Sequence, residues 1–128
     1  MENNHTYRKL LVWQKSMLLV TEIYNEVKIF PSDKLYALTS QIKRSATSIP
    51  SNIAEGYGRE GTKDYLRFLN IALSSLFELQ TQLEIAYNLK FFKENNFENL
   101  YKNTREIERM LTSFIRKLKG KNFETLKL

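Results

Sequence analysis

Residues 33–57 read DKLYALTSQIKRSATSIPSNIAEGY, and one face of this stretch is apolar at a helical spacing. The apolar positions recur every three or four residues and are Leu35, Leu38, Ile42, Ala46, Ile49 and Ile53. This spacing predicts an amphipathic α-helix rather than a strand. Pro50 lies within the pattern, and it removes the hydrogen bond to the carbonyl of Ala46. We therefore expect one proline-kinked helix over 33–57, with two shorter helices meeting at Pro50 as the alternative.

Three more helices are predicted around this one, over about 9–28, 63–90 and 96–119. The apolar seam of the first consists of Leu10, Trp13, Met17, Val20, Tyr24 and Val27. The inward positions of the last are Leu100, Ile107, Leu111, Phe114 and Leu118. Such spacings of three and four are typical of helices packed in a bundle.

Turns are scarce, because the sequence holds only 4 Gly and 2 Pro. This composition disfavours an all-β fold, which needs frequent turn residues. The expected fold is all-α, an antiparallel up-down four-helix bundle. We expect a single domain over 1–128, in which 1–7 and 120–128 are flexible tails.

The predicted third helix has two apolar rows. The first row is Leu66, Leu69, Leu73, Leu76, Leu83 and Tyr87, and the second is Tyr65, Phe68, Ala72, Leu79 and Ala86. A helix that is apolar on two sides needs two partners. Either it lies centrally against several helices, or its second row faces another subunit. The second interpretation predicts an oligomer interface, formed by Tyr65, Phe68, Ala72 and Leu79.

Few residues are suited to catalysis or to metal binding. The chain has no cysteine and a single histidine, His5. These counts exclude thiolate metal sites and clusters of His ligands, and the place of the one histidine in a predicted tail disfavours His-based nucleophilic catalysis. We expect no catalytic site and no metal, and therefore not an enzyme. The sequence lacks both an apolar run long enough for a membrane span and a signal peptide, so no membrane association and a cytoplasmic location are expected.

Residues 56–61 read GYGREG and satisfy the pattern G-x-G-x-x-G. A dinucleotide site requires this motif to follow a strand and to begin a βαβ unit. Here it follows a predicted helix, so we expect no cofactor. The glycines are interpreted as left-handed caps that end the second helix.

A basic stripe is predicted on the fourth helix. Its cations are Lys102, Arg105, Arg109, Arg116 and Lys119. Residues 102–127 hold 8 basic and 3 acidic residues, a net charge of +5 out of the chain's +6. Such a stripe is either a solvated face or a site for nucleic-acid phosphates. A second possible phosphate site is the start of the third helix, beside Arg59, Lys63 and Arg67.

Small polar side chains flank the apolar stripe of the second helix. They are Gln41, Ser45, Ser48, Asn52 and Glu55. At the edge of a core, such groups make hydrogen bonds between helices or between subunits. Recognition of a ligand is the alternative.

Residues 29–59 also carry a recognisable signature. Its parts are Phe30-Pro31, Leu38-Thr39-Ser40-Gln41-Ile42, Arg44, Ser48-Ile49-Pro50-Ser51-Asn52-Ile53-Ala54-Glu55-Gly56 and Arg59, with further matches at Leu11-Val12-Trp13-Gln14-Lys15 and Tyr65-Leu66-Arg67-Phe68-Leu69-Asn70-Ile71-Ala72. Over about residues 9–118, the chain resembles the four-helix proteins encoded in bacterial 23S ribosomal RNA intervening sequences.

This resemblance implies a four-helix bundle that assembles as a ring, with a homopentamer as the expected form. The accessory variability determinants of diversity-generating retroelements are related bundles that engage nucleic acid and a reverse transcriptase. Two functions are therefore expected as alternatives. The first is a non-catalytic, oligomeric protein that binds the phosphates of RNA or DNA. The second is a protein-interaction scaffold or an accessory subunit of a reverse transcriptase or another nucleic-acid enzyme.

Overall fold

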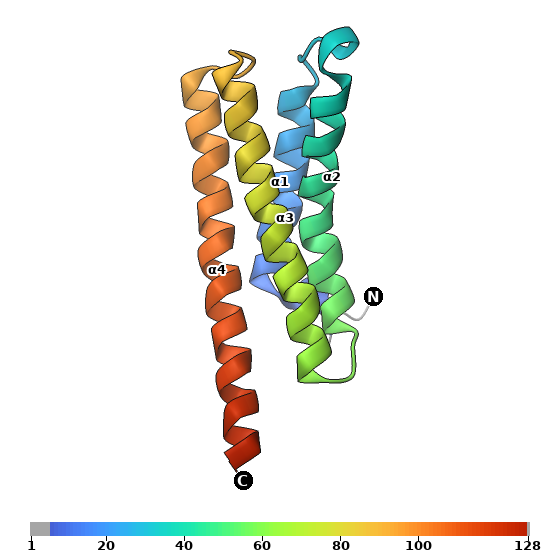
Figure 1. The fold of residues 1–128 in the computed structure, drawn as a ribbon, viewed down its shortest axis with the longest axis vertical. Helices are drawn as coiled ribbons and strands as arrows, with labels where there is room; N and C mark the ends of the chain where they lie inside the picture. The colour runs from blue at the N-terminus through green and yellow to red at the C-terminus, as the bar shows by residue number, and fades with distance from the viewer. Residues whose placement is uncertain (1–5, 128) are drawn as a thin grey trace.

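Four long helices, preceded by one short turn of 3-10 helix, form the part of the chain that the structure describes. This computed structural model describes residues 6–127, and for residues 32–34 and 121–127 it describes the backbone alone. The elements are η1 (Tyr7–Lys9), α1 (Leu11–Val27), α2 (Ser32–Tyr57), α3 (Thr62–Asn88) and α4 (Glu94–Lys127). Successive helices run in opposite directions (Figure 1). α1 and α3 each pack against α2 and α4. The predicted all-α, up-down four-helix bundle is confirmed.

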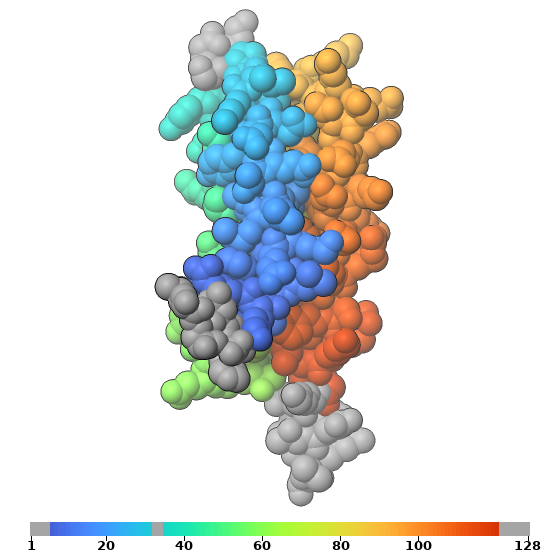
Figure 2. All heavy atoms as spheres, turned by 180° about the vertical axis from the view of Figure 1, so that it is seen from behind, coloured from blue at the N-terminus to red at the C-terminus, as the bar shows by residue number. Residues whose placement is uncertain are grey.

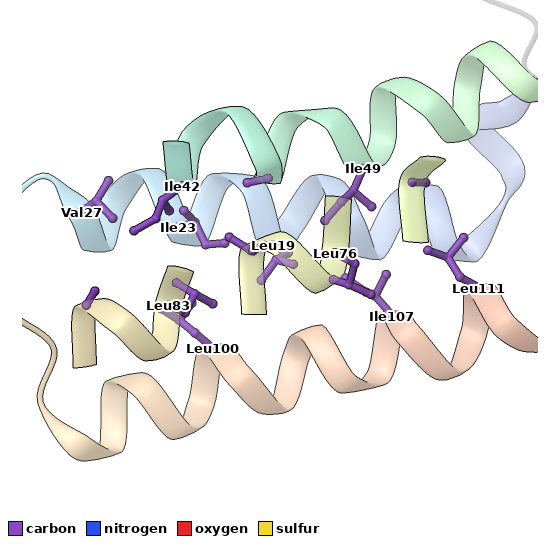
Figure 3. Close-up of a cluster of buried hydrophobic side chains, with 14 of the residues drawn as sticks. Leu19, Ile23, Val27, Ile42, Ile49, Leu76, Leu83, Leu100, Ile107 and Leu111 are labelled. Atoms are coloured by element: carbon purple, nitrogen blue, oxygen red, sulfur yellow. The ribbon is translucent and has the colours of Figure 1, made fainter. Parts of the chain in front are cut away.

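All four helices contribute to one apolar core (Figure 3). Its fully or almost fully buried members include Leu19, Ile23, Ile42, Ile49, Leu76, Leu83, Leu100, Ile107 and Leu111. Along the part of each helix that faces the core, core residues recur about once per turn, as the sequence spacing predicts. The predicted helix boundaries agree with the observed ones to within two residues, except at the end of α4.

The buried face of α1 differs from the predicted one. The buried positions are Val12, Ser16, Leu19, Ile23 and Val27. Of the predicted seam, Val27 is buried and three residues pack partly buried against the core, namely Leu10, Trp13 and Val20. Met17 is 42% exposed and Tyr24 is 37% exposed. Both rows have helical spacing and lie about 100° apart around the helix axis. The contacts with α2 and α4 therefore decide which row is most deeply buried, and periodicity alone selects a row that is only partly buried.

Helix α2 passes through Pro50 without ending, so the alternative of two shorter helices is wrong. The kink in α2 occurs at Leu35, where φ is −118° and ψ is 15°, and not at Pro50, so the predicted position of the kink is wrong. The predicted apolar face is confirmed at Ile42, Ala46 and Ile49, each with no exposed surface.

Both apolar rows of α3 pack inside the chain. Leu69, Leu76 and Leu83 of the first row are fully buried, and so are Ala72 and Leu79 of the second. α3 packs against both α2 and α4. Ala72 and Leu79 therefore have no surface to offer another subunit. Their predicted place in an oligomer interface is wrong.

The ends of the chain are more regular than predicted. Helix α4 continues through the expected tail to Lys127. Once a helix has formed, each further residue adds a hydrogen bond, and no proline interrupts this segment. At the other end, the Thr6 hydroxyl accepts a hydrogen bond from the Arg8 amide at 3.2 Å and caps η1. Residues 1–5 and 128 of the predicted tails lie outside the described residues.

Where α2 leads into α3, glycine is needed because the two helices approach each other closely. None of the glycines in the described part of the chain has a positive φ, so the interpretation as left-handed caps is wrong. A Cβ atom on Gly56 would lie 2.9 Å from Cβ of Phe68 and 2.9 Å from a ring carbon of Tyr65. Gly56 therefore permits the close approach of α2 and α3. A Cβ atom on Gly58 would meet nothing closer than the Glu55 carbonyl oxygen, at 3.6 Å.

We expect opposite effects from alanine at these two glycines. Gly56→Ala should lower the free energy of unfolding by about 1–3 kcal/mol, because the new methyl group overpacks the α2–α3 contact. Gly58→Ala should raise it by about 0.4–1 kcal/mol, because its φ of −80° suits alanine and the unfolded chain loses freedom. Urea denaturation of both variants measures the difference. Equal stabilities would contradict the role assigned to Gly56.

Candidate nucleic-acid interface

The predicted basic stripe lies on the outer face of α4. The side chains of Lys102, Arg105, Arg109, Arg116 and Lys119 are all exposed. Leu100, Ile107 and Leu111 occupy the opposite face and are buried against the other helices. At 1.5 Å of rise per residue, the stripe is about 25 Å long, which corresponds to roughly seven base pairs of duplex DNA. The structure therefore brings all five predicted cations onto one surface.

The two acidic residues among these cations are turned toward neighbouring helices. The Glu106 carboxylate accepts a hydrogen bond from Lys15 of α1 at 3.2 Å. The Glu108 carboxylate accepts one from the Gln80 amide of α3 at 3.0 Å. It also forms an ion pair of 3.3 Å with Arg105.

The other four stripe cations have no ion pair with a residue whose side chain the structure describes. Contacts between helices thus engage Glu106 and Glu108. The positive charge remains on the solvent side, where it attracts anions.

The second predicted phosphate site is largely neutralised within the chain. Arg59 and Arg67 both lie over the ring of Phe68, at 4.6 and 4.4 Å from its centroid. Arg67 forms an ion pair of 3.0 Å with Asp64, and Arg59 forms one of 2.9 Å with Glu55. Lys63 is exposed beside them. The structure brings the two arginines together, but a phosphate would have to compete with two carboxylates for them.

Tyr65 and Phe68 are both partly buried, and contacts within the chain cover much of each ring. The Tyr65 ring meets the ring of Phe114 on α4 edge to face, with centroids 5.7 Å apart. Burial, together with nearby Tyr57, raises the pKa of Tyr65 to about 12, so this hydroxyl is neutral at physiological pH. The hydroxyl has no hydrogen-bond partner among the described residues. Tyr65 thus joins α3 to α4, while Phe68 lies beneath the two guanidinium groups.

Two members of the polar row on α2 make hydrogen bonds to α3, as predicted for this row. The Ser45 hydroxyl donates to the Gln82 side chain of α3 at 2.8 Å. The hydroxyls of Ser48 and Ser75 are 2.8 Å apart. Asn52 donates to the Ser48 carbonyl at 2.8 Å. Ser45, Ser48 and Asn52 thus have partners within the chain, which disfavours the alternative that they recognise a ligand.

Analysis of the sequence missed a groove between the start of α1 and the second half of α4. Figure 2 shows these two segments side by side, dark blue against red-orange. The groove has a volume of about 450 Å³ and is lined by Leu10, Leu11, Val12, Glu106, Arg109, Met110, Ser113, Phe114 and Lys117. In the sequence, the only indication of this groove is that the apolar residues Met110 and Phe114 adjoin the basic stripe. The neighbouring wall comes from residues about 100 positions away.

Two further features of the described residues bear on the class of site. They contain no group of three or more His, Cys, Asp or Glu side chains placed to hold a metal ion. None of their helices has a stretch long and apolar enough to cross a membrane. His5, the single histidine, lies outside the described residues.

The fold and the cationic face of α4 define a small, basic helical-bundle protein. A family model described as 23S rRNA-intervening sequence protein matches residues 8–113. The chain belongs to this family, and the resemblance found in the sequence is confirmed.

A solved structure supports the same assignment. It is a protein of unknown function from the S23 ribosomal protein family of Bacteroides thetaiotaomicron, with 30% sequence identity and a TM-score of 0.77. The similarity covers 82% of this chain and 98% of that one. Comparison with curated proteins gives no match.

Proposed function

We propose that this chain is a non-catalytic, oligomeric protein of the cytoplasm that binds the phosphate backbone of RNA or DNA. The observation that supports the proposal most directly is that the basic side chains of the α4 stripe face solvent, while the acidic side chains among them contact neighbouring helices. From residue 102 to residue 119 there are six basic and two acidic residues, a net of +4, and both acids are engaged by other side chains. The cations left on the outside face solvent along one line. Lys and Arg in such an array bind phosphates and release condensed counterions.

Titration with structured RNA and with duplex DNA, at about 50 and 200 mM salt, tests this function. Four phosphate contacts per subunit predict that the affinity falls roughly 100-fold over this range. Little preference among sequences is expected, because phosphate contacts position a protein without specifying bases. An affinity that is independent of salt, or no binding at 50 mM, would refute the proposal.

A role as an interaction scaffold, or as an accessory subunit of a reverse transcriptase, is the second candidate. It is favoured by apolar side chains that remain exposed on two different helices. Met17 and Tyr24 of α1 are 42% and 37% exposed, and Phe77 and Ile85 of α3 are 45% and 43% exposed. A reverse-transcriptase gene beside the coding sequence would support this candidate. A coding sequence inside a ribosomal RNA gene would support the first.

The same two faces suit a ring of identical subunits. A contact between two different faces repeats from subunit to subunit and closes into a ring when the rotation allows it. The number of subunits implied by the family resemblance is five. Phe77 and Ile85 replace the buried Ala72 and Leu79 as the α3 part of the proposed interface.

We expect light scattering at micromolar concentration to give a mass of about five times 15.2 kDa. The double variant Phe77→Asp, Ile85→Asp should lower the mass without loss of helix content, because both side chains are exposed in the single chain. Glu78→Asp and Glu84→Asp, two exposed positions on the same helix, form the control and should leave the mass unchanged. A wild-type mass of 15.2 kDa at every concentration would exclude the ring.

A further inference from the structure

We propose that the groove between α1 and α4 receives an unpaired base of a single-stranded nucleic acid whose phosphates lie on the basic stripe. This inference rests on the proposed function and names the form of nucleic acid that the site prefers. Its basis is the way in which an apolar groove and a row of cations share one edge of α4.

The groove has the size and lining of a site for a small flat group. Its volume of about 450 Å³ lies within the range of about 300–1,000 Å³ that is usual for small-molecule sites. Leu10 and Leu11 form one wall, and Met110 and Phe114 form the other. Nucleobases stack on aromatic and apolar side chains, and each stacked base contributes about 1–3 kcal/mol.

The charges at the rim of the groove favour an anionic ligand. Arg109 and Lys117 lie two helical turns apart on the α4 side of the groove, and both are exposed. The carboxylate of Glu106, also at the rim, is paired with Lys15 at 3.2 Å. Because this acidic charge is already paired, the two cations dominate the potential at the opening. An uncharged apolar peptide would leave both of them without a partner.

Arg109 connects the groove with the stripe, since it belongs to both. At 100° per residue, the groove residues of α4 lie on the face next to the stripe and closer to α1. A strand whose phosphates follow the stripe could therefore turn a base sideways into the groove. Only a strand with unpaired bases can do this, because the bases of a duplex are stacked inside it. The arrangement thus predicts a preference for single strands that phosphate contacts alone would not produce.

The first test uses the wild-type chain and single strands with and without bases. We expect RNA and DNA single strands of mixed sequence to bind roughly 5- to 100-fold more tightly than abasic strands of equal length, at about 150 mM salt. The abasic strand keeps the phosphates and lacks the bases, so the ratio isolates the contribution of the bases. The RNA and DNA strands show whether the ribose hydroxyl adds to it. Equal affinity for normal and abasic strands would overturn the inference.

The second test fills the groove without changing its charge. Ser113→Phe places a ring between the groove walls and should reduce the preference for bases to near unity. Ser51→Phe is the matched control, because it makes the same change at an exposed position in a groove on α2 that lies outside the stripe and the proposed subunit interface. It should leave the preference intact. Circular dichroism checks that both variants fold. If Ser113→Phe does not fold, the comparison of normal and abasic strands with the wild-type chain still tests the inference.

Failure of this inference can be distinguished from failure of the proposed function. If the affinity falls steeply with salt but is equal for normal and abasic strands, the stripe binds phosphates and the groove has no part in recognition. If neither single strands nor duplexes bind at about 50 mM salt, both proposals are wrong. A base preference that survives Ser113→Phe also contradicts the assignment of the bases to this groove.

Discussion

Replacement of Arg105, Arg109 and Arg116 by Glu is expected to weaken nucleic-acid binding at about 50 mM salt by at least 100-fold. Each substitution removes a phosphate contact and adds a charge that repels phosphate. The slope of log affinity against log salt should therefore fall by about three. The three side chains are exposed, so the bundle should keep its helix content and its mass. Filter binding or fluorescence anisotropy at several salt concentrations measures both quantities.

A control variant with the same net charge distinguishes the effect of the stripe on binding from the effect of the chain's overall charge. Three Arg→Glu changes each alter the charge by two units, which takes the formal net charge from +6 to zero. Replacement of Lys28, Arg44 and Lys93 by Glu has the same effect on net charge, at exposed positions away from the stripe. This control should retain most of the affinity. If both triple variants lose affinity equally, nucleic acid is attracted by the net charge of the chain as a whole. The stripe is then only a solvated face.

Leu19→Ala is expected to lower the free energy of unfolding by about 2–5 kcal/mol, and Leu18→Ala to change it by no more than about 0.5 kcal/mol. The two residues are neighbours of the same type on α1, but Leu19 is 2% exposed and Leu18 is 71% exposed. Truncation of Leu19 leaves a cavity in the core shown in Figure 3. Truncation of Leu18 removes a side chain that is mostly in contact with solvent.

This pair also tests the orientation of α1. If the seam predicted from the sequence were the buried one, Met17→Ala would be costly and Leu19→Ala would be mild. Urea denaturation of the three variants decides between the two orientations. A Met17→Ala variant that is less stable than Leu19→Ala would contradict the structure.

The candidate site was only partly predictable from the sequence. The spacing of Lys102, Arg105 and Arg109 places them on one helix face through local geometry alone, and the structure agrees. The neutralisation of Arg67 by Asp64 also follows from a spacing of three residues on α3, but the sequence analysis did not use it. The pairing of Glu106 with Lys15 joins two helices, so no local pattern indicates it. The groove beside the stripe went unpredicted for the same reason.

By itself, the sequence determined the number of helices, their approximate boundaries and their order along the chain. These properties depend on interactions between residues three or four positions apart, and on a shortage of Gly and Pro. The buried face of α2 was also determined locally, because Ile42, Ala46 and Ile49 have no competing apolar row on the same helix.

Only the tertiary structure decided which apolar row of α1 is buried and whether the second row of α3 faces a subunit or the chain's own core. α1 and α3 each carry two rows of helical spacing, so their own sequences do not choose between them. The neighbouring helices decide which row is buried. α1 buries Leu19 and Ile23 because α2 and α4 pack against that face. α3 buries Ala72 and Leu79 because it packs against the same two helices. Burial depends on which surfaces meet in space, and periodicity along one helix does not contain that information.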